Sequence, residues 1–207
     1  MVTFIWDLDG TLLDSYDVIV SGLYNVCKEF GYKGNIEEIR IEAIKHSVSY
    51  FIDKIVKEKG LPFEKIKERY SKITEENNDK ITLMEHAKEV LEGLKEKNID
   101  SFILTHRGLS TDFVLNNVGI SGYFKEVITS KSGFKRKPDP EGINYLIEKY
   151  NLDRNNTYYV GDRVLDIECA NNANIKSILY LPKESFTIPT LKETYIVSDL
   201  IDILKLI

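Results

Sequence analysis

From residue 85 onward the chain alternates between short β-rich runs and amphipathic helical segments. After a first strand predicted at 2–6, this part contains predicted strands at 101–105, 127–128, 158–160, 177–181 and 196–197. Helices are predicted at 85–97, 110–118, 140–150, 165–172 and after Ser198. Such alternation favours a parallel sheet with right-handed crossovers and helices on both faces. The sequence therefore predicts an α/β protein with a Rossmann-like core, in which ligands bind at the carboxyl ends of the strands.

The stretch between the first strand and this alternation has a different, purely helical pattern. Apolar residues recur at spacings of three and four over 16–30, 48–56 and 63–73, and no strand is predicted between residues 15 and 80. We therefore expect a core domain formed by residues 1–14 and 84–207, with a small helical domain, residues 15–83, inserted after the first strand.

Composition limits the classes of function. Because 43% of its residues are hydrophobic, the chain can bury a sizeable core. Its net charge of -5 repels polyanions such as nucleic acids. Its two cysteines, Cys27 and Cys169, form no metal-ligand or disulfide pattern. The N-terminus lacks the basic region of a signal peptide, and no apolar run is long enough to span a membrane. We expect a cytoplasmic protein without nucleic-acid or membrane partners, and either a monomer or a homodimer.

Two aspartates, Asp7 and Asp9, follow the first predicted strand directly. Carboxylates a few ångströms apart raise each other's pKa unless a cation neutralises them, so the pair indicates either a metal site or an acid/base couple. Gly10 allows a sharp turn in which backbone N–H groups can approach an anion. The alternative interpretation is an ordinary Asp-Gly turn with one capping aspartate.

Two further segments combine a strand or helix end with a phosphate-binding type of residue. Thr105 ends a predicted strand and could bind a phosphoryl oxygen, although a helix N-cap would suit it equally. Lys137 precedes a predicted helix, with Asp139 as N-cap and Pro140 at the first helical position. This lysine could reach a carboxylate and a phosphate together, whereas the basic run 131–137 that contains it could also be a solvated loop.

A second acid pair follows the strand predicted at 158–160. If a helix begins near Arg163, Asp162 lies at the strand end and Asp166 lies one turn into the helix, so both can face one cation. The alternative is that Asp162 is only an N-cap. Two acid pairs, a threonine and a lysine are thus all predicted near the strand ends of one sheet, and such a combination is improbable by chance.

These segments, 7–15, 104–105, 137–140 and 161–166, resemble in this order the sequence motifs of the haloacid dehalogenase-like (HAD) hydrolase superfamily. The resemblance is strongest to its phosphoglycolate-phosphatase-like branch, which has a helical cap between the first two motifs. It implies a Mg2+-dependent phosphatase of a small phosphorylated metabolite, phosphoglycolate-like or a sugar phosphate. Asp7 would be the nucleophile that forms an aspartyl-phosphate and Asp9 the general acid/base, while Thr105 and Lys137 would bind the phosphoryl group.

The resemblance also implies how the metal is held. Mg2+ would bind the Asp7 carboxylate, the Asp9 backbone carbonyl and Asp162, and Asp166 would support this set of ligands. Arg163 departs from the pattern, since relatives usually carry Thr or Ser after the Gly-Asp pair.

Two other departures concern substrate binding. Lys45 and His46 stand where relatives often have a glycine in a substrate-specificity loop, and His106 follows Thr105 in place of a commoner asparagine. We expect Lys45, His46 and His106 to contact substrate, with the alternative that Lys45 and His46 only join two helices.

Three other activities compete with this interpretation. A phosphomutase of the β-phosphoglucomutase type would pass the phosphoryl group to a sugar hydroxyl instead of water. A dehalogenase is less favoured, because halide release needs no acid at position 9. A non-enzymatic phospho-acceptor module would be a shorter chain with its acids on different strands.

Overall fold

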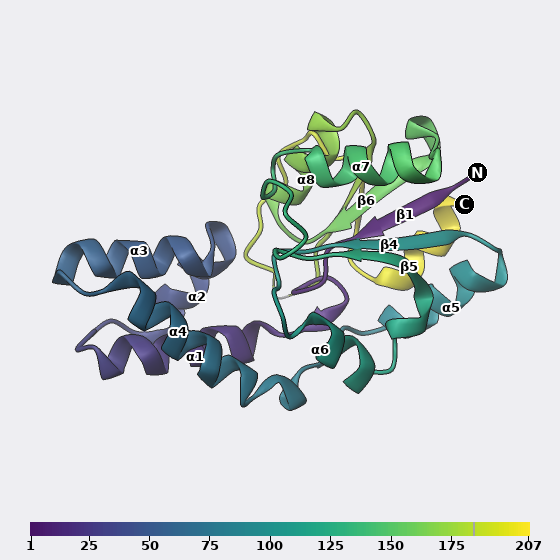
Figure 1. The fold of residues 1–207 in the computed structure, drawn as a ribbon. Helices are drawn as coiled ribbons and strands as arrows, with labels where there is room; N and C mark the ends of the chain where they lie inside the picture. Colours follow the sequence, from purple (N-terminus) through teal and green to yellow (C-terminus); the bar gives the residue numbers. More distant parts are fainter. Residues whose placement is uncertain (184) are drawn as a thin grey trace. The chain divides into compact units, whose positions relative to one another are not determined.

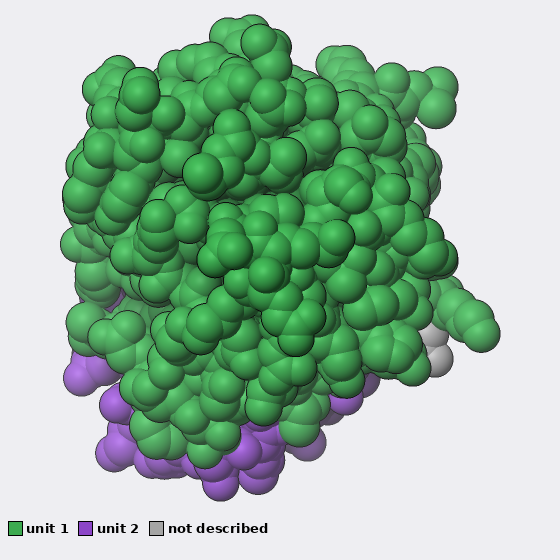
Figure 2. Space-filling view, turned by 90° about the vertical axis from the view of Figure 1, so that its right-hand side faces the viewer, with its two compact units in different colours: residues 1–14, 82–207 green, residues 15–81 purple. Residues whose placement is uncertain are grey.

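The computed structural model of the protein describes residues 1–183 and 185–207, which form two compact units. The first unit comprises Met1–Asp14 and Thr82–Ile207, and the second comprises Ser15–Ile81; Figure 2 distinguishes them by colour. We expected the inserted segment to extend through residue 83. Instead, β3 (Thr82–Leu83) pairs antiparallel with β2 (Leu13–Asp14), so both belong to the first unit. Strands of two residues are too short to show a periodicity in the sequence.

The first unit is built on a six-stranded sheet with the order β5-β4-β1-β6-β7-β8 (Figure 1). The strands are β1 (Thr3–Trp6), β4 (Asp100–Leu104), β5 (Phe124–Ile128), β6 (Thr157–Gly161), β7 (Lys176–Tyr180) and β8 (Tyr195–Val197). Each neighbouring pair runs parallel. The predicted α/β fold with a parallel sheet is therefore confirmed.

Helices cover both faces of this sheet. Figure 1 shows α7 (Glu141–Tyr150) and α8 (Val164–Asn172) on one face and α5 (Ala87–Glu96) and α6 (Thr111–Asn117) on the other. Ile5, Phe102 and Tyr159 lie side by side on β1, β4 and β6 and pack beneath α7 and α8. Because side chains alternate along a strand, this register fixes which residues face each helical layer.

The second unit consists of helices with a core of their own. Its elements are α1 (Tyr16–Glu29), α2 (Ile36–Lys45), α3 (Val48–Lys59), α4 (Phe63–Glu75) and the 3-10 helix η1 (Asn78–Lys80). Lys45 ends α2, His46 follows it, and the Ser47 hydroxyl accepts the Tyr50 N–H at 3.1 Å at the start of α3. Lys45 and His46 thus join two helices, and their contact with substrate stays a prediction.

The remaining short elements refine the expected boundaries. They are the 3-10 helices η2 (Ser121–Tyr123), η3 (Arg154–Asn156) and η4 (Leu200–Leu206), the last of which replaces the α-helix expected after Ser198. Pro140, expected inside α7, lies at its N-cap, and the Asp139 carboxylate accepts the N–H of Glu141 at 3.1 Å. In the described part of the chain, none of the helices has the length and apolar character needed to cross a membrane.

Candidate active site

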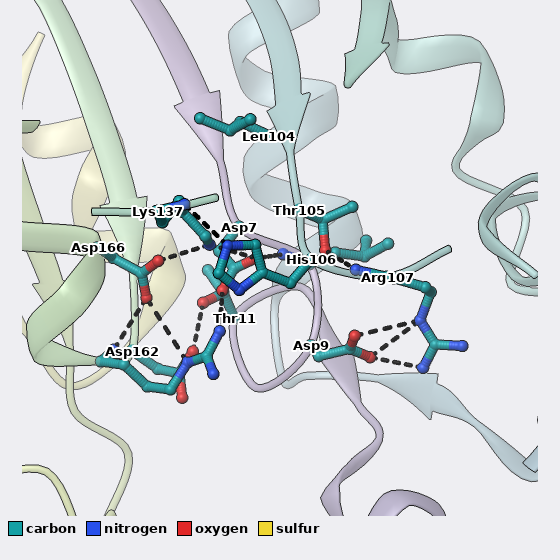
Figure 3. A network of polar contacts seen from close by, with 12 residues as sticks. Asp7, Asp9, Thr11, Leu104, Thr105, His106, Arg107, Lys137, Asp162 and Asp166 are labelled. Carbon is teal, nitrogen blue, oxygen red and sulfur yellow. Dashed lines mark hydrogen bonds and ion pairs between the residues drawn. The ribbon is translucent and has the colours of Figure 1, made fainter. Parts of the chain in front are cut away.

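The predicted chemical residues meet at the carboxyl edge of the sheet (Figure 3). Asp7 follows β1, Thr105 follows β4 and Asp162 follows β6, while Lys137 lies in the loop between β5 and α7. All four are buried. Parallel strands end at the same edge, so residues that directly follow different strands become neighbours in space.

The Lys137 ammonium group lies at the centre of this cluster. It is 2.6 Å from Asp166 Oδ1, 2.9 Å from the Tyr159 hydroxyl and 3.0 Å from Asp7 Oδ1, so each of its N–H groups has an acceptor. The Tyr159 hydroxyl in turn donates to the Leu104 carbonyl at 2.7 Å. Burial favours the neutral lysine, but Asp166 and Asp7 outweigh it and raise the pKa of Lys137. The lysine is therefore a buried, fully hydrogen-bonded cation.

Asp7 is one of the two carboxylates that contact the Lys137 ammonium group. Its Oδ1 accepts the Leu8 N–H at 2.8 Å as well as Lys137, and its Oδ2 lies 3.3 Å from Arg163 Nη2. Burial would raise the pKa of Asp7, but Lys137 and Arg163 more than offset this and hold it below its usual range. Asp7 is therefore ionised, as a nucleophilic carboxylate must be.

A second group of contacts assembles three buried carboxylates. Asp7, Asp162 and Asp166 each offer an oxygen, and these oxygens lie within 4.8 Å of one another. The Thr11 hydroxyl donates to Asp162 Oδ1 at 3.0 Å, and the Arg163 N–H donates to Asp166 Oδ2 at 3.1 Å. Several hard oxygen donors with a surplus of negative charge fit a cation of the Mg2+ type.

The start of α8 explains how two of these acids face one point. Arg163 occupies the N-cap of α8, so Asp162 belongs to the strand end and is not the helix cap. Gly161 makes room for the arrangement, because a Cβ built there would lie 2.6 Å from Asp166 Oδ2. The alternative interpretation of Asp162 as a simple N-cap is therefore wrong.

Asp9 lies apart from the carboxylate cluster and pairs with Arg107. Arg107 Nη2 lies 2.6 Å from Asp9 Oδ1, and Nε lies 3.1 Å from Oδ1 and 3.2 Å from Oδ2 (Figure 3). Gly10, with a φ of 81°, turns the chain just beyond Asp9, and its N–H donates to the Leu13 carbonyl at 2.9 Å. This left-handed conformation suits glycine, which has no Cβ to clash there.

The loop after β4 connects this pair to the lysine. The Thr105 hydroxyl accepts the Arg107 N–H at 3.1 Å, and the N-cap position of the helix that follows is Ser110, so Thr105 is not a helix cap. His106 Nε2 accepts the backbone N–H of Lys137 at 2.9 Å. Burial and the charge of Lys137 lower the pKa of His106 to about 3, which keeps the ring neutral and able to accept. His106 thereby positions the lysine loop, and its predicted contact with substrate remains a prediction.

Sequence reasoning missed the roles of Thr11, Tyr159, Arg107 and Arg163. Tyr159 had a usable signal, since it lies two positions before Gly161 and therefore on the same face of β6. The two arginines had none, because each contact depends on the conformation of an irregular loop.

Comparison with known proteins agrees with this geometry. Over residues 4–180 the chain matches the family model described as haloacid dehalogenase-like hydrolase. It is 27% identical to the pyrophosphatase PpaX of Oceanobacillus iheyensis over 99% of this chain and 96% of that protein. It is 26% identical to the phosphoglycolate phosphatase of Aquifex aeolicus over 87% and 85% of the two chains.

The fold gives the same result. The crystal structure of a predicted phosphoglycolate phosphatase from Haemophilus somnus 129PT superposes with a TM-score of 0.89 at 26% identity, covering 100% of this chain and 97% of that one. Fold, strand-end residues and family model coincide over most of the sequence, and the chain therefore belongs to the haloacid dehalogenase-like hydrolase family.

Proposed function

We propose that this hydrolase is a Mg2+-dependent phosphatase of a small phosphorylated metabolite, phosphoglycolate-like or a sugar phosphate. The observation that carries the proposal is Asp7, an ionised carboxylate at the end of β1 with Lys137 on one oxygen and two further acids within reach of a shared cation. The names of its relatives, pyrophosphatase and phosphoglycolate phosphatase, support phosphoryl chemistry.

Catalysis would take place in two steps. An Asp7 oxygen attacks phosphorus, the bond from phosphorus to the leaving oxygen breaks, and Asp9 donates its proton to that oxygen. Asp9 then takes a proton from the water that attacks the aspartyl-phosphate, which releases phosphate and restores Asp7. Each group thus returns to its initial protonation state.

The other residues would bind and hold the phosphoryl group. Lys137 and the Thr105 hydroxyl face its oxygens, and His106 and Tyr159 fix the lysine from two sides. Asp7, Asp162 and Asp166, with the Asp9 backbone carbonyl, would hold Mg2+. When bound, this ion offsets the repulsion between a carboxylate and a phosphate dianion and stabilises the charge of the transferred group.

Family membership disfavours one of the competing activities, and the acceptor of the phosphoryl group distinguishes another. Membership of a hydrolase family does not fit a non-enzymatic phospho-acceptor module. A phosphomutase differs only in the acceptor of the phosphoryl group, and turnover with sugar phosphates separates it from a phosphatase.

The test is hydrolysis of p-nitrophenyl phosphate with and without Mg2+ by wild type and Asp7→Asn. We expect Asp7→Asn to lose several orders of magnitude in kcat, because an amide is a poor nucleophile. Asp112→Asn, an exposed acid of α6, is the matched control and should keep full activity. Retention of more than about a tenth of wild-type kcat by Asp7→Asn would overturn the assignment.

A further inference from the structure

Arg107 contacts the side chain proposed as the general acid/base. Two of its nitrogens, Nε and Nη2, donate to the Asp9 carboxylate, and both carboxylate oxygens accept. The guanidinium is also fixed from its own loop, since Nη1 donates to the Ser110 hydroxyl at 3.1 Å and the Arg107 N–H donates to Thr105 Oγ1. Its position is therefore set by the turn after β4 as well as by Asp9.

This contact has to open during turnover. To act as the acid, one Asp9 oxygen must carry a proton and face the leaving oxygen, yet in the structure Arg107 donates to both oxygens. A hydrogen-bonded guanidinium needs a replacement acceptor when it gives one up, because an unsatisfied buried donor is costly. The Arg107 side chain is only 8% exposed, so water is a limited substitute.

The substrate itself can supply that acceptor. Proton transfer requires the leaving oxygen to come within about 3 Å of Asp9. Since Arg107 Nη2 is 2.6 Å from Asp9, a group just beyond the leaving oxygen would be within reach of the guanidinium. Guanidinium groups bind carboxylate and phosphate in a forked, charge-assisted geometry.

We infer that Arg107 is a specificity-determining residue that selects substrates whose leaving group carries its own anionic group, a carboxylate or a phosphate, close to the ester oxygen. The inference rests on the proposed phosphatase function. An anionic leaving group takes over the guanidinium and frees Asp9 to transfer its proton. A neutral leaving group has no anion that could take the place of the Asp9 carboxylate on Arg107, so proton transfer from Asp9 is slower.

The experiment compares two substrates that differ at one group. 2-Phosphoglycolate carries a carboxylate where ethyl phosphate carries a methyl group, and kcat/KM is measured for both with Mg2+. We expect wild type to prefer 2-phosphoglycolate, and Arg107→Gln to lose about tenfold to a hundredfold of this preference, the usual effect of one charge-assisted contact. Arg107→Lys should keep part of the preference, because it retains the charge without the fork.

Lys131→Gln is the matched control, since Lys131 is an exposed cation near Gly108 on the same edge and the variant should keep the wild-type ratio. If Arg107→Gln lowers kcat/KM equally for both substrates, Arg107 only positions Asp9, and the inference is wrong. The inference is also wrong if the variant changes kcat/KM for neither substrate. If wild type hydrolyses both esters equally well, the inference fails while the phosphatase function stands. If wild type hydrolyses neither these esters nor p-nitrophenyl phosphate, the proposed function itself fails.

Discussion

The hydrogen bonds of Lys137 show how a single side chain is prepared for its substrate. Its ammonium group has three acceptors, Asp7, Asp166 and Tyr159, so a phosphoryl oxygen can bind only by replacing one of them. Asp7 is the one that changes during the proposed reaction, because its oxygen becomes bonded to phosphorus. Asp166 and Tyr159 then keep the lysine in place while the phosphoryl group takes the third position.

Tyr159→Phe tests this role. It removes the hydroxyl that joins Lys137 to the Leu104 carbonyl, and we expect kcat/KM to fall by about tenfold, equivalent to roughly 1.4 kcal/mol, the net value of one good hydrogen bond. Tyr158→Phe is the control, because the Tyr158 hydroxyl lies on the opposite face of β6 from Tyr159 and accepts a hydrogen bond from Lys176. Equal effects of the two variants in steady-state kinetics would contradict a specific role of Tyr159.

Between elements, the turn from β6 into α8 carries the strictest steric requirement of the site. Gly161 ends β6, and Asp166 on α8 packs directly against it. The closeness lets Asp166 reach both Lys137 and the Arg163 N–H. A side chain at position 161 would have to displace the carboxylate that completes the proposed metal site.

Gly161→Ala should therefore weaken binding of Mg2+ by about tenfold or more, measured by calorimetric titration, since loss of a supporting contact to a metal site commonly costs that much. Gly122→Ala is the matched control, because a Cβ built at Gly122 meets nothing within 4 Å. Unchanged Mg2+ affinity in Gly161→Ala would show that Asp166 does not support the metal.

The elements also show what the sequence could predict. Asp7, Thr105 and Asp162 were predictable because each directly follows a strand with a clear apolar pattern, and parallel topology brings strand ends together. The β2 and β3 pairing was not, since two-residue strands have no period. The contact of Arg107 with Asp9 could not be predicted either, because it joins residues 98 positions apart through two irregular turns.

For the whole molecule, two histidines give stability opposite dependences on pH. His86 at the start of α5 lies 2.8 Å from Asp199, which caps η4. The hydrogen bond that the His86 ring donates to the Asp199 carboxylate raises the pKa of His86, and the nearby Glu85 and Glu89 add to this effect. A raised pKa in the folded state gives stability that is fully present below about pH 6.5 and is lost as pH rises through the folded value.

His106 has the opposite sign. Burial lowers the folded pKa of His106 to about 3. The positive charges of Lys137, Arg136 and Arg163 near the ring add to this effect and outweigh the opposite effect of Asp7. Below about pH 6.5 His106 is therefore protonated in the unfolded chain but not in the folded chain. The free energy of unfolding falls by about 1.4 kcal/mol per pH unit as pH decreases toward 3.

The free energy of unfolding should therefore be greatest near pH 6.5, and urea unfolding from pH 5 to pH 9 measures it. The His106→Gln variant should lose less stability than wild type between pH 6.5 and 5, because the glutamine oxygen can still accept from Lys137 and does not titrate in this range. His86→Gln should instead lose less than wild type above pH 6.5, because the ion pair with Asp199 is already absent. If each variant followed the wild-type curve in parallel, the two histidines would not be the groups that set it, and the neutral state assigned to His106 beside Lys137 would be wrong.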